Sequence, residues 1–345
     1  MATRHAIGHR LDPLLAPRSI AFVGASTRSG SVGNNMIKEI LAGGFTGEIY
    51  PVNPRYDSVE GVKCYPSLAA LPEPVDHVVL AVANRRLETQ LAEAAAHGAR
   101  AATIFASGYL EGDSDPPLVE RLAGIARDAG MEVCGGNCPG FYNFGANIFV
   151  AAFPCGGHAE PGPITLITHS GSLMYPLVDI EGRLSYNLVI SSGQELVTTA
   201  ADYLDYALDL PSTRVVALFL ETVRDPRGFR AALEKARGRR VPVVVLKVGR
   251  TAQSAALAVS HSGAIAGDDA AYQAVFEHHG VIRVHDIEEM VATLMLLSME
   301  RRVSSGGLAA ILDSGGSREL LIDLVDDVGM AFAKISAETR ERLAQ

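Results

Sequence analysis

Short apolar runs alternate with longer amphipathic stretches along the first third of the chain. A short run that is apolar throughout is typical of a strand buried on both faces, and the longer stretches have the length of helices. Their alternation predicts a parallel sheet with helices on both faces, which is an α/β fold. The expected strands cover residues 19–23, 48–52, 77–82 and 101–105, and the expected helices include residues 85–97 and 117–129.

A second series of the same kind follows the glycine- and proline-rich segment 155–163, which we interpret as a domain boundary. A third unit begins with an expected strand over residues 307–313 and an expected helix over 318–328. Because one βα unit cannot cover both faces of a sheet, we expect this third domain to be incomplete, as in a fused or truncated protein. The second series has expected strands at 164–168, 188–191, 215–220 and 241–247, and expected helices at 199–208 and 227–237.

The charge balance excludes several classes of partner. A formal net charge of -9 gives no general attraction to nucleic acid or to an anionic membrane surface. No apolar stretch reaches the roughly 18 residues that a membrane span requires. We expect no signal peptide, since Asp12, Pro13 and Pro17 interrupt the apolar run near the start.

The cysteines and histidines exclude two further kinds of site. The four cysteines form no C-x-x-C pair and are too sparse for a disulfide framework, which indicates a reducing, cytoplasmic environment. No metal site is expected, because His278 and His279 are adjacent on one expected helix and no H-E-x-x-H motif occurs. The composition therefore predicts a soluble cytoplasmic protein without a metal centre.

A glycine-rich loop from Gly24 to Gly33 follows the first expected strand and leads into an expected helix. Glycine permits tight turns and close approach of the backbone to a phosphate, and a helix N-terminus presents free N–H groups. The spacing is not the dinucleotide fingerprint, because Ser26 stands where G-x-G-x-x-G has its second glycine, and no Lys-Ser/Thr follows as in a Walker loop. A turn without a ligand and a phosphate cradle assisted by Arg28 both remain open.

Polar loops also follow other expected strands of the first domain. Asn53 and Arg55 come directly after the second strand, Ser107 follows the fourth, and Asn137 lies in the glycine-rich segment 135–140. The carboxyl ends of parallel strands share one edge of the sheet, where open α/β folds bind their ligands. Together these loops predict a binding crevice, although an Asn-Pro-Arg sequence is also ordinary turn chemistry.

The second domain carries three polar features at corresponding places. Ser170 begins an expected helix whose exposed amides can hold an anion, and Glu221 ends an apolar run. His261 lies in a loop of small residues between two helical segments. A lone histidine is more often structural, and that alternative stays open. A carboxylate such as Glu221 would orient an exposed imidazole, and the helix start after Ser170 would hold a phosphate attached to it.

The order of these motifs resembles that of the α subunit of succinyl-CoA synthetase, and still more that of the ADP-forming acetyl-CoA synthetases. The resemblance covers nearly the whole chain, from about Pro17 to Gln345. It implies a Rossmann-like CoA-binding domain at 1–155, a flavodoxin-like CoA-ligase domain at 156–302, and the start of a further α/β ligase domain at 303–345. The matching motifs are GAS…GSVG at 24–33, YPVNPR at 50–55, NCPG at 137–140, HSGSLMY at 169–175, FLE at 219–221 and SHSGAIAG at 260–267.

The resemblance also implies a role for each matching residue. His261 would be phosphorylated during turnover, and Glu221 would orient it. The helix start at Ser170 and Gly171 would receive the phosphate, and Tyr175 matches a position near the acyl substrate. The residues that would line the CoA crevice are Gly24, Ser26, Thr27, Arg28, Ser29, Gly33, Asn53, Pro54, Arg55, Ser107, Asn137 and Cys138.

The reaction that the resemblance implies joins ATP, a carboxylic acid and CoA into acyl-CoA, ADP and phosphate, through acyl phosphate and phosphohistidine. A covalent carrier divides one difficult transfer into easier steps. No ATP-grasp domain is recognisable in the chain, so a separate domain or subunit would bind ATP and ADP with magnesium. The expected partners are therefore CoA, a carboxylic acid and an ATP-grasp component, and we expect an oligomer.

Two departures from the family pattern leave an alternative open. Gly136 replaces the proline of G-P-N-C, and the acetate-type pattern G-N-x-x-D is Gly-Gln-Glu-Leu-Val at 193–197. The alternative is a non-catalytic module that binds CoA or acyl-CoA and regulates another protein. The presence of both His261 and Glu221 favours the enzyme. The glycine spacing, with Asn53 where an acid would stand, disfavours a nicotinamide dehydrogenase.

Overall fold

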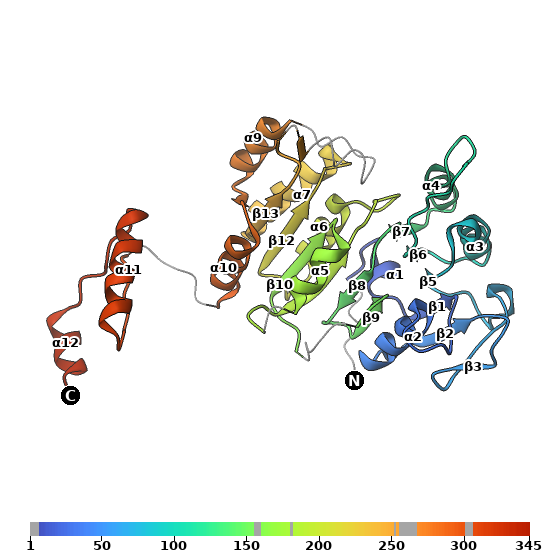
Figure 1. Cartoon of the computed structure of the whole chain (residues 1–345), viewed down its shortest axis with the longest axis horizontal. Helices are drawn as coiled ribbons and strands as arrows, with labels where there is room; N and C mark the ends of the chain where they lie inside the picture. Colours follow the sequence, from blue (N-terminus) through green and yellow to red (C-terminus); the bar gives the residue numbers. More distant parts are fainter. Residues whose placement is uncertain (1–6, 155–159, 180–181, 252, 255–267, 301–305) are drawn as a thin grey trace. The chain divides into compact units, whose positions relative to one another are not determined.

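The computed structural model describes residues 7–154, 160–179, 182–251, 253–254, 268–300 and 306–345 (Figure 1). The chain forms two compact units, Met1–Ser298 and Met299–Gln345, which are described separately below. Among the described residues, no helix is long and apolar enough to span a membrane.

The first sheet is parallel and has the strand order β2-β1-β5-β6-β7. Strands β1, β5 and β6 are buried along their whole length, which is why their sequences are apolar throughout. The chain moves from β1 to one side for β2 and to the other side for β5, so the β1 and β5 loops flank a switch point where α/β sheets bind ligands. The strands are β1 (Ser19–Val23), β2 (Glu48–Val52), β5 (His77–Leu80), β6 (Ala101–Ile104) and β7 (Glu132–Gly135).

Helices cover both faces of this sheet, as the sequence predicts. Ile20 and Phe22 of β1 belong to the buried cluster that includes α1 and α2, whereas Ala21 and Val23 belong to the cluster that includes α3 and α4. Alternate residues of one strand therefore pack against opposite helix layers. The remaining elements here are α1 (Asp12–Leu15), α2 (Val32–Ala42), β3 (Ser58–Val59), β4 (Val62–Lys63), η1 (Leu68–Ala70), α3 (Asn84–Ala96) and α4 (Leu118–Asp128).

The second sheet has the order β14-β13-β12-β10-β11-β8-β9, in which β10 to β14 are parallel and β8 and β9 are antiparallel. The hairpin of β8 and β9 precedes residue 155 in the chain, yet it hydrogen-bonds to β11 of the second sheet. The strands are β8 (Gly140–Asn143), β9 (Ile148–Ala151), β10 (Ile164–Thr168), β11 (Tyr186–Ser191), β12 (Val215–Leu220), β13 (Val243–Lys247) and β14 (Ile282–Val284).

Helices α6 and α7 pack on one face of the second sheet, and α5 and α10 pack on the other. The α6–α7 side shares one buried cluster with the α1–α2 side of the first sheet, through residues such as Leu15, Met36 and Tyr206. This common core joins the two sheets into one unit. The helices are α5 (Gly171–Val178), α6 (Ala200–Asp209), α7 (Pro226–Arg239), α9 (Asp269–His279) and α10 (Ile287–Ser298).

The second unit contains two helices, α11 (Gly315–Asp327) and α12 (Ala337–Leu343), among its described residues. The predicted strand over residues 307–313 is wrong. Among the described residues of this unit, Leu308 makes a single isolated bridge to Phe332, and no strand pairs with the rest of the apolar run to form a ladder. Its apolar side chains are largely exposed within this unit, and Ile311 is 92% exposed.

Candidate functional site

The glycine-rich loop after β1 is closed by two glycines that pack on each other. Gly24 has φ +93°, a left-handed conformation that favours glycine, and a Cβ added at Gly33 would overlap the carbonyl oxygen of Gly24. Ser26 N donates a hydrogen bond to Gly33 O at 3.0 Å. The backbone therefore folds back on itself tightly before α2 begins.

The tip of this loop is exposed and carries the predicted phosphate-binding groups. Thr27, Arg28 and Ser29 are all exposed to solvent. Ser31 is the N-cap of α2, but its side chain makes no capping bond and instead donates to Arg28 O at 2.6 Å. The first N–H groups of α2 thus face an open, positively charged loop, an arrangement that suits a phosphate.

Asn53 ties the loop after β2 to the glycine-rich loop. Its Nδ2 donates to Ala25 O at 2.7 Å, and its Oδ1 accepts from Arg55 N at 3.1 Å. Hydrogen bonds with Ser26 and Thr27 lower the pKa of the Tyr56 hydroxyl. Pro54 and Arg55 are exposed, so Arg55 adds a second cation to this rim.

Two further predicted CoA-binding segments meet at the ends of β6 and β7. Asn137 is exposed, has φ +52°, and donates its backbone N–H to Ala106 O at 2.9 Å. Ser107 accepts a hydrogen bond from Asn84 Nδ2 at 3.3 Å. The side chain of Cys138 is buried, with its sulfur 4.0 Å from that of Cys134. Its hydrogen bond with Cys134, together with burial, raises the pKa of the Cys138 thiol well above its ordinary value.

The predicted phosphate-receiving helix, α5, begins beside the first sheet's NCPG loop. Ser170 is its N-cap without a side-chain capping bond, and Ser170 Oγ lies 3.1 Å from Ser172 Oγ. A Cβ added at Gly171 would lie 2.6 Å from Pro139 Cδ, so only glycine permits this contact. Gln194 N also donates to Gly136 O at 2.8 Å. The carboxyl edges of the two sheets therefore meet at this place.

A buried histidine–carboxylate pair lies directly behind the start of α5. His169 Nε2 is 2.9 Å from Glu195 Oε1, and both side chains are almost fully buried. Glu221 N–H donates to His169 Nδ1 at 3.1 Å, which leaves Nε2–H to donate to the Glu195 carboxylate. His169 thus joins the loops after β10, β11 and β12.

No motif in the sequence predicted this pair. His169 and Glu195 stand within motifs described above, but only the neighbouring Ser170 and the altered Gly-Gln-Glu-Leu-Val pattern drew attention. A histidine that ends an apolar strand and precedes a Ser-Gly helix start was the available signal. The partner Glu195 comes from another loop, so its pairing requires the fold.

The remaining predicted residues of the second domain are placed as follows. Glu221 is half-buried at the end of β12, beside His169. Tyr175 lies in α5 and packs edge-to-face on Phe153, with ring centroids 5.8 Å apart. His261 lies outside the described residues.

Lys247 is a further buried polar residue at this edge that no sequence motif predicted. It ends β13 and is 2% exposed, and its Nζ donates to Val248 O at 2.5 Å and lies 4.6 Å from the Tyr272 ring centroid. Burial lowers the pKa of Lys247 to about 8. Lys247 therefore loses its proton more easily than an ordinary lysine, and it lies at the same sheet edge as Glu221.

Among the residues that the structure describes, one group of metal-type ligands lies away from these loops. Donor atoms of His9, Asp205 and Asp209 lie within 4.8 Å of one another. Lys235 Nζ bonds to both carboxylates, at 2.7 Å from Asp205 Oδ1 and 2.9 Å from Asp209 Oδ2. This group is an ion-pair cluster, and the absence of a metal centre stays a prediction.

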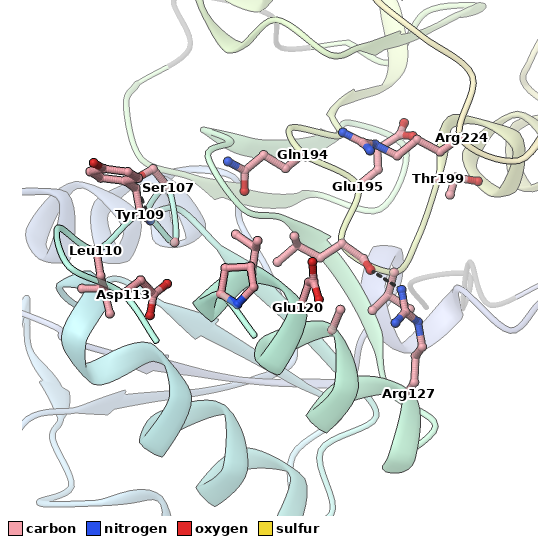
Figure 2. Close-up of a pocket in the computed structure, with 16 residues that line it drawn as sticks. Ser107, Tyr109, Leu110, Asp113, Glu120, Arg127, Gln194, Glu195, Thr199 and Arg224 are labelled. Atoms are coloured by element: carbon pink, nitrogen blue, oxygen red, sulfur yellow. Dashed lines mark hydrogen bonds between the residues drawn. The ribbon is translucent and has the colours of Figure 1, made fainter. Parts of the chain in front are cut away.

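A cavity of 710 Å³ opens between the two sheet edges (Figure 2). Ser107, Tyr109 and Leu110 approach it from the first sheet, and Gln194, Glu195 and Arg224 approach it from the second (Figure 2). Helix α4 forms its floor. The cavity thus borders both the predicted CoA crevice and the His169–Glu195 pair.

Comparisons with known proteins agree with this architecture. Residues 18–143 match the model of a CoA binding domain, and residues 161–297 match a succinyl-CoA ligase like flavodoxin domain. An ADP-forming acetate–CoA ligase of Methanocaldococcus jannaschii is 32% identical over 340 residues, which are 97% of this chain and 47% of that protein. This chain therefore spans about half the length of that relative.

Two other relatives are covered more fully. The α subunit of ADP-forming acetate–CoA ligase I of Pyrococcus furiosus is 30% identical over 327 residues, 93% of this chain and 70% of that subunit. An acetyl-coenzyme A synthetase of Ca. Korarchaeum cryptofilum, solved in complex with phosphate and ADP, superposes with a TM-score of 0.84 at 28% identity. That match covers 94% of this chain and 70% of the solved one.

Proposed function

This chain belongs to the family of ADP-forming acetate–CoA ligases, and we propose that it is the CoA-binding and phosphohistidine component of an acyl-CoA synthetase. The observation that carries the proposal is the meeting of two sheet edges. One edge has an open glycine-rich loop suited to a phosphate, the other has the start of α5, and Gly171 contacts Pro139 where they join. A reaction that transfers a phosphoryl group and then an acyl group needs the CoA site and the phosphate site at the start of α5 to lie close together.

The first edge would bind CoA. The phosphates of CoA would lie on the backbone amides at the start of α2, with Arg28 and Arg55 as counter-charges. The pantetheine arm would run along the strand ends past Ser107 toward Asn137. Because Cys138 is buried, this residue would contribute its backbone and not its thiol.

The second edge would handle the phosphoryl group. ATP would phosphorylate His261, the carboxylate of the acid would accept the phosphoryl group from His261 to give acyl phosphate, and the CoA thiolate would displace phosphate to give acyl-CoA. Glu221 would orient the imidazole of His261, and the amides at Ser170 and Gly171 would hold the phosphoryl group during these transfers. Tyr175, one turn further along α5, would lie near the acid.

Positioning of this machinery would fall to His169 and Glu195. The hydrogen bond from Glu221 N–H to His169 fixes the backbone of Glu221 relative to the start of α5. Glu195 in turn holds the imidazole in one tautomer. The pair would therefore keep the orienting carboxylate and the phosphate station at a constant separation.

The nucleotide would be bound elsewhere, by an ATP-grasp domain or subunit, so we propose an assembly of this chain with such a component. Magnesium would neutralise charge on the ATP phosphates there. No residue described above is assigned to that task.

Calorimetry of the full chain with CoA and with NAD tests the proposal. We expect CoA to bind and NAD not to bind, because the glycine-rich loop lacks the dinucleotide spacing. Together with an ATP-grasp component, the chain should release phosphate from ATP only when both CoA and a suitable acid are present. Binding of NAD in preference to CoA would contradict the proposed function.

A further inference from the structure

The cavity between the sheet edges is large for the smallest acids. Its volume of 710 Å³ falls within the range of about 300–1,000 Å³ that is usual for pockets that enclose a drug-sized ligand. It borders Ser107 of the predicted CoA crevice at one end and Glu195, the partner of His169, at the other. The acyl group is the one part of the reaction that is bonded first to the phosphoryl group and then to the CoA sulfur. It therefore has to lie between these two ends.

Part of the cavity wall is apolar. Leu110 and Val119 contribute to its wall from the first sheet and α4, and Leu196 and Val197 contribute from the loop after β11. Leu196 and Val197 are only partly buried, although they pack against the core of the first sheet. An apolar ligand that covers this surface removes it from water, which makes binding more favourable.

The cavity also has polar and charged lining residues, which include Asp113, Glu120, Arg127, Gln194, Glu195 and Arg224. Glu195 Oε2 and Gln194 Oε1 are buried and have no hydrogen-bond partner among the residues that the structure describes. Both atoms are acceptors, so they match the amide N–H and thiol donors of a pantetheine arm and would repel the carboxylate of an acid. Arg127 bonds to the backbone of the apolar wall, because its Nη2 donates to Leu196 O at 3.3 Å (Figure 2).

We propose that this cavity is the acyl-binding pocket, and that it selects a monocarboxylic acid whose apolar body is larger than that of acetate. The inference rests on the proposed function and adds its substrate class. The apolar wall formed by Leu110, Val119, Leu196 and Val197 covers the body of the acid. The pantetheine arm of CoA enters beside Ser107 and reaches the buried acceptors of Gln194 and Glu195. The acyl carbon lies between its thiol and the start of α5.

The test uses binding of acyl-CoA thioesters to the full chain, which requires no ATP-grasp component. Calorimetry is done with CoA, acetyl-CoA, butanoyl-CoA, hexanoyl-CoA and phenylacetyl-CoA. Each methylene that enters the pocket should tighten binding by up to about fourfold. We expect hexanoyl-CoA or phenylacetyl-CoA to bind at least about tenfold more tightly than acetyl-CoA.

Two variants change the pocket in opposite ways. Val197→Asp places a charge in the apolar wall and should bring hexanoyl-CoA down to the affinity of acetyl-CoA. Val119→Phe keeps the wall apolar but fills it, and should weaken phenylacetyl-CoA while butanoyl-CoA still binds. Leu296→Asp, at an exposed position of α10 away from the pocket, is the control and should change neither.

Retained affinity for CoA itself shows that each variant is folded. If CoA binds but all acyl chains bind alike, the pocket assignment is overturned and the proposed function stands. The same holds if Val197→Asp leaves the preference for long chains unchanged. If CoA does not bind the full chain, the proposed function fails and the inference fails with it.

Discussion

The carboxyl edges of the two sheets are built from different materials. The edge of the first sheet is mostly backbone: Gly24 and Gly33 close a tight loop, and the side chains at its tip are exposed. The edge of the second sheet is held by buried polar side chains, namely His169, Glu195 and Lys247. The first arrangement suits a charged ligand that binds from solution. The second suits a group that must be held in one geometry while bonds change.

The difference predicts which kind of change damages each edge. The first edge should lose its fold and its CoA binding when volume is added, and should lose only part of its CoA affinity when a single side chain is removed. The second edge should tolerate no loss of charge or hydrogen bonding, even where the shape is kept.

Gly33→Ala should damage the first edge strongly, although it adds a single methyl group. The added Cβ would overlap Gly24 O, which is backbone and cannot turn aside. We expect the free energy of unfolding to fall by about 2–4 kcal/mol, with loss of CoA binding. Urea denaturation and calorimetry measure the two effects.

Gly30→Ala is the matched control in the same loop. A Cβ there meets nothing within 4 Å, so only its positive φ opposes the substitution, at a cost of about 1–2 kcal/mol. Equal losses in the two variants would show that the packing of Gly24 on Gly33 is not what closes the loop.

Glu195→Gln should impair turnover while leaving the fold intact. The amide keeps the shape and can still accept from His169, but it removes the charge that holds the imidazole. We expect kcat of the complete enzyme to fall by about 10–100-fold, with little change in the affinity for CoA. The conservative variant thus separates a positioning role from a purely structural one.

Glu120→Gln is the control for that variant, because Glu120 is an exposed carboxylate that lines the same cavity. It should leave kcat unchanged. If both variants lowered kcat alike, the effect would belong to the charge of the cavity and not to the pair with His169.

Lys247 should make stability depend on pH in the alkaline range. Its pKa is lowered by burial from 10.5 to about 8, so between these values the unfolded chain binds a proton that the folded chain does not. Stability then rises with pH through this window, relative to a variant without the amine. Between pH 7 and pH 10, the wild type should gain about 2 kcal/mol relative to Lys247→Met in urea denaturation. Parallel pH profiles would refute the buried, weakly protonated amine.

Arg28→Ala should have the smallest effect, since this side chain is exposed. We expect the Kd for CoA to rise about tenfold at low salt and by less at 0.5 M salt, because an exposed charge is screened. Arg237→Ala, at an exposed position in the last turn of α7, is the control and should leave the Kd unchanged. A salt-independent loss would mean that Arg28 acts through packing.

The same contrast explains how far the sequence alone could lead. The buried strands and the glycine-rich loop are determined by residues that are close together in the sequence. The apolar run Ile164–Thr168 and the pair Gly24 and Gly33 are examples. The predicted α/β fold and the family are confirmed by the sheets and by the comparisons. The strand predicted at 307–313 is wrong, because a strand also needs a neighbouring strand to pair with. The pattern of apolar residues does not show whether such a neighbour is present.

The second edge was predicted less completely, because its contacts join loops distant in the chain. His169 and Glu195 are separated by 26 residues, and His169 and Glu221 by 52. Motif order pointed to Ser170, Glu221 and His261 but not to the residues that connect them. The role of the altered Gly-Gln-Glu-Leu-Val pattern depends on the fold, which places four of its residues on the wall of one cavity.

Transfer of label from ATP to the protein tests whether His261 carries the phosphoryl group. The chain is mixed with an ATP-grasp component and γ-labelled ATP, and the labelled residue is identified after proteolysis under alkaline conditions, which preserve phosphohistidine. We predict label on His261 and none on the His261→Ala variant, while label on the wild type disappears when CoA and a suitable acid are added. Label that persists in His261→Ala, or that resides on another residue, would contradict the account.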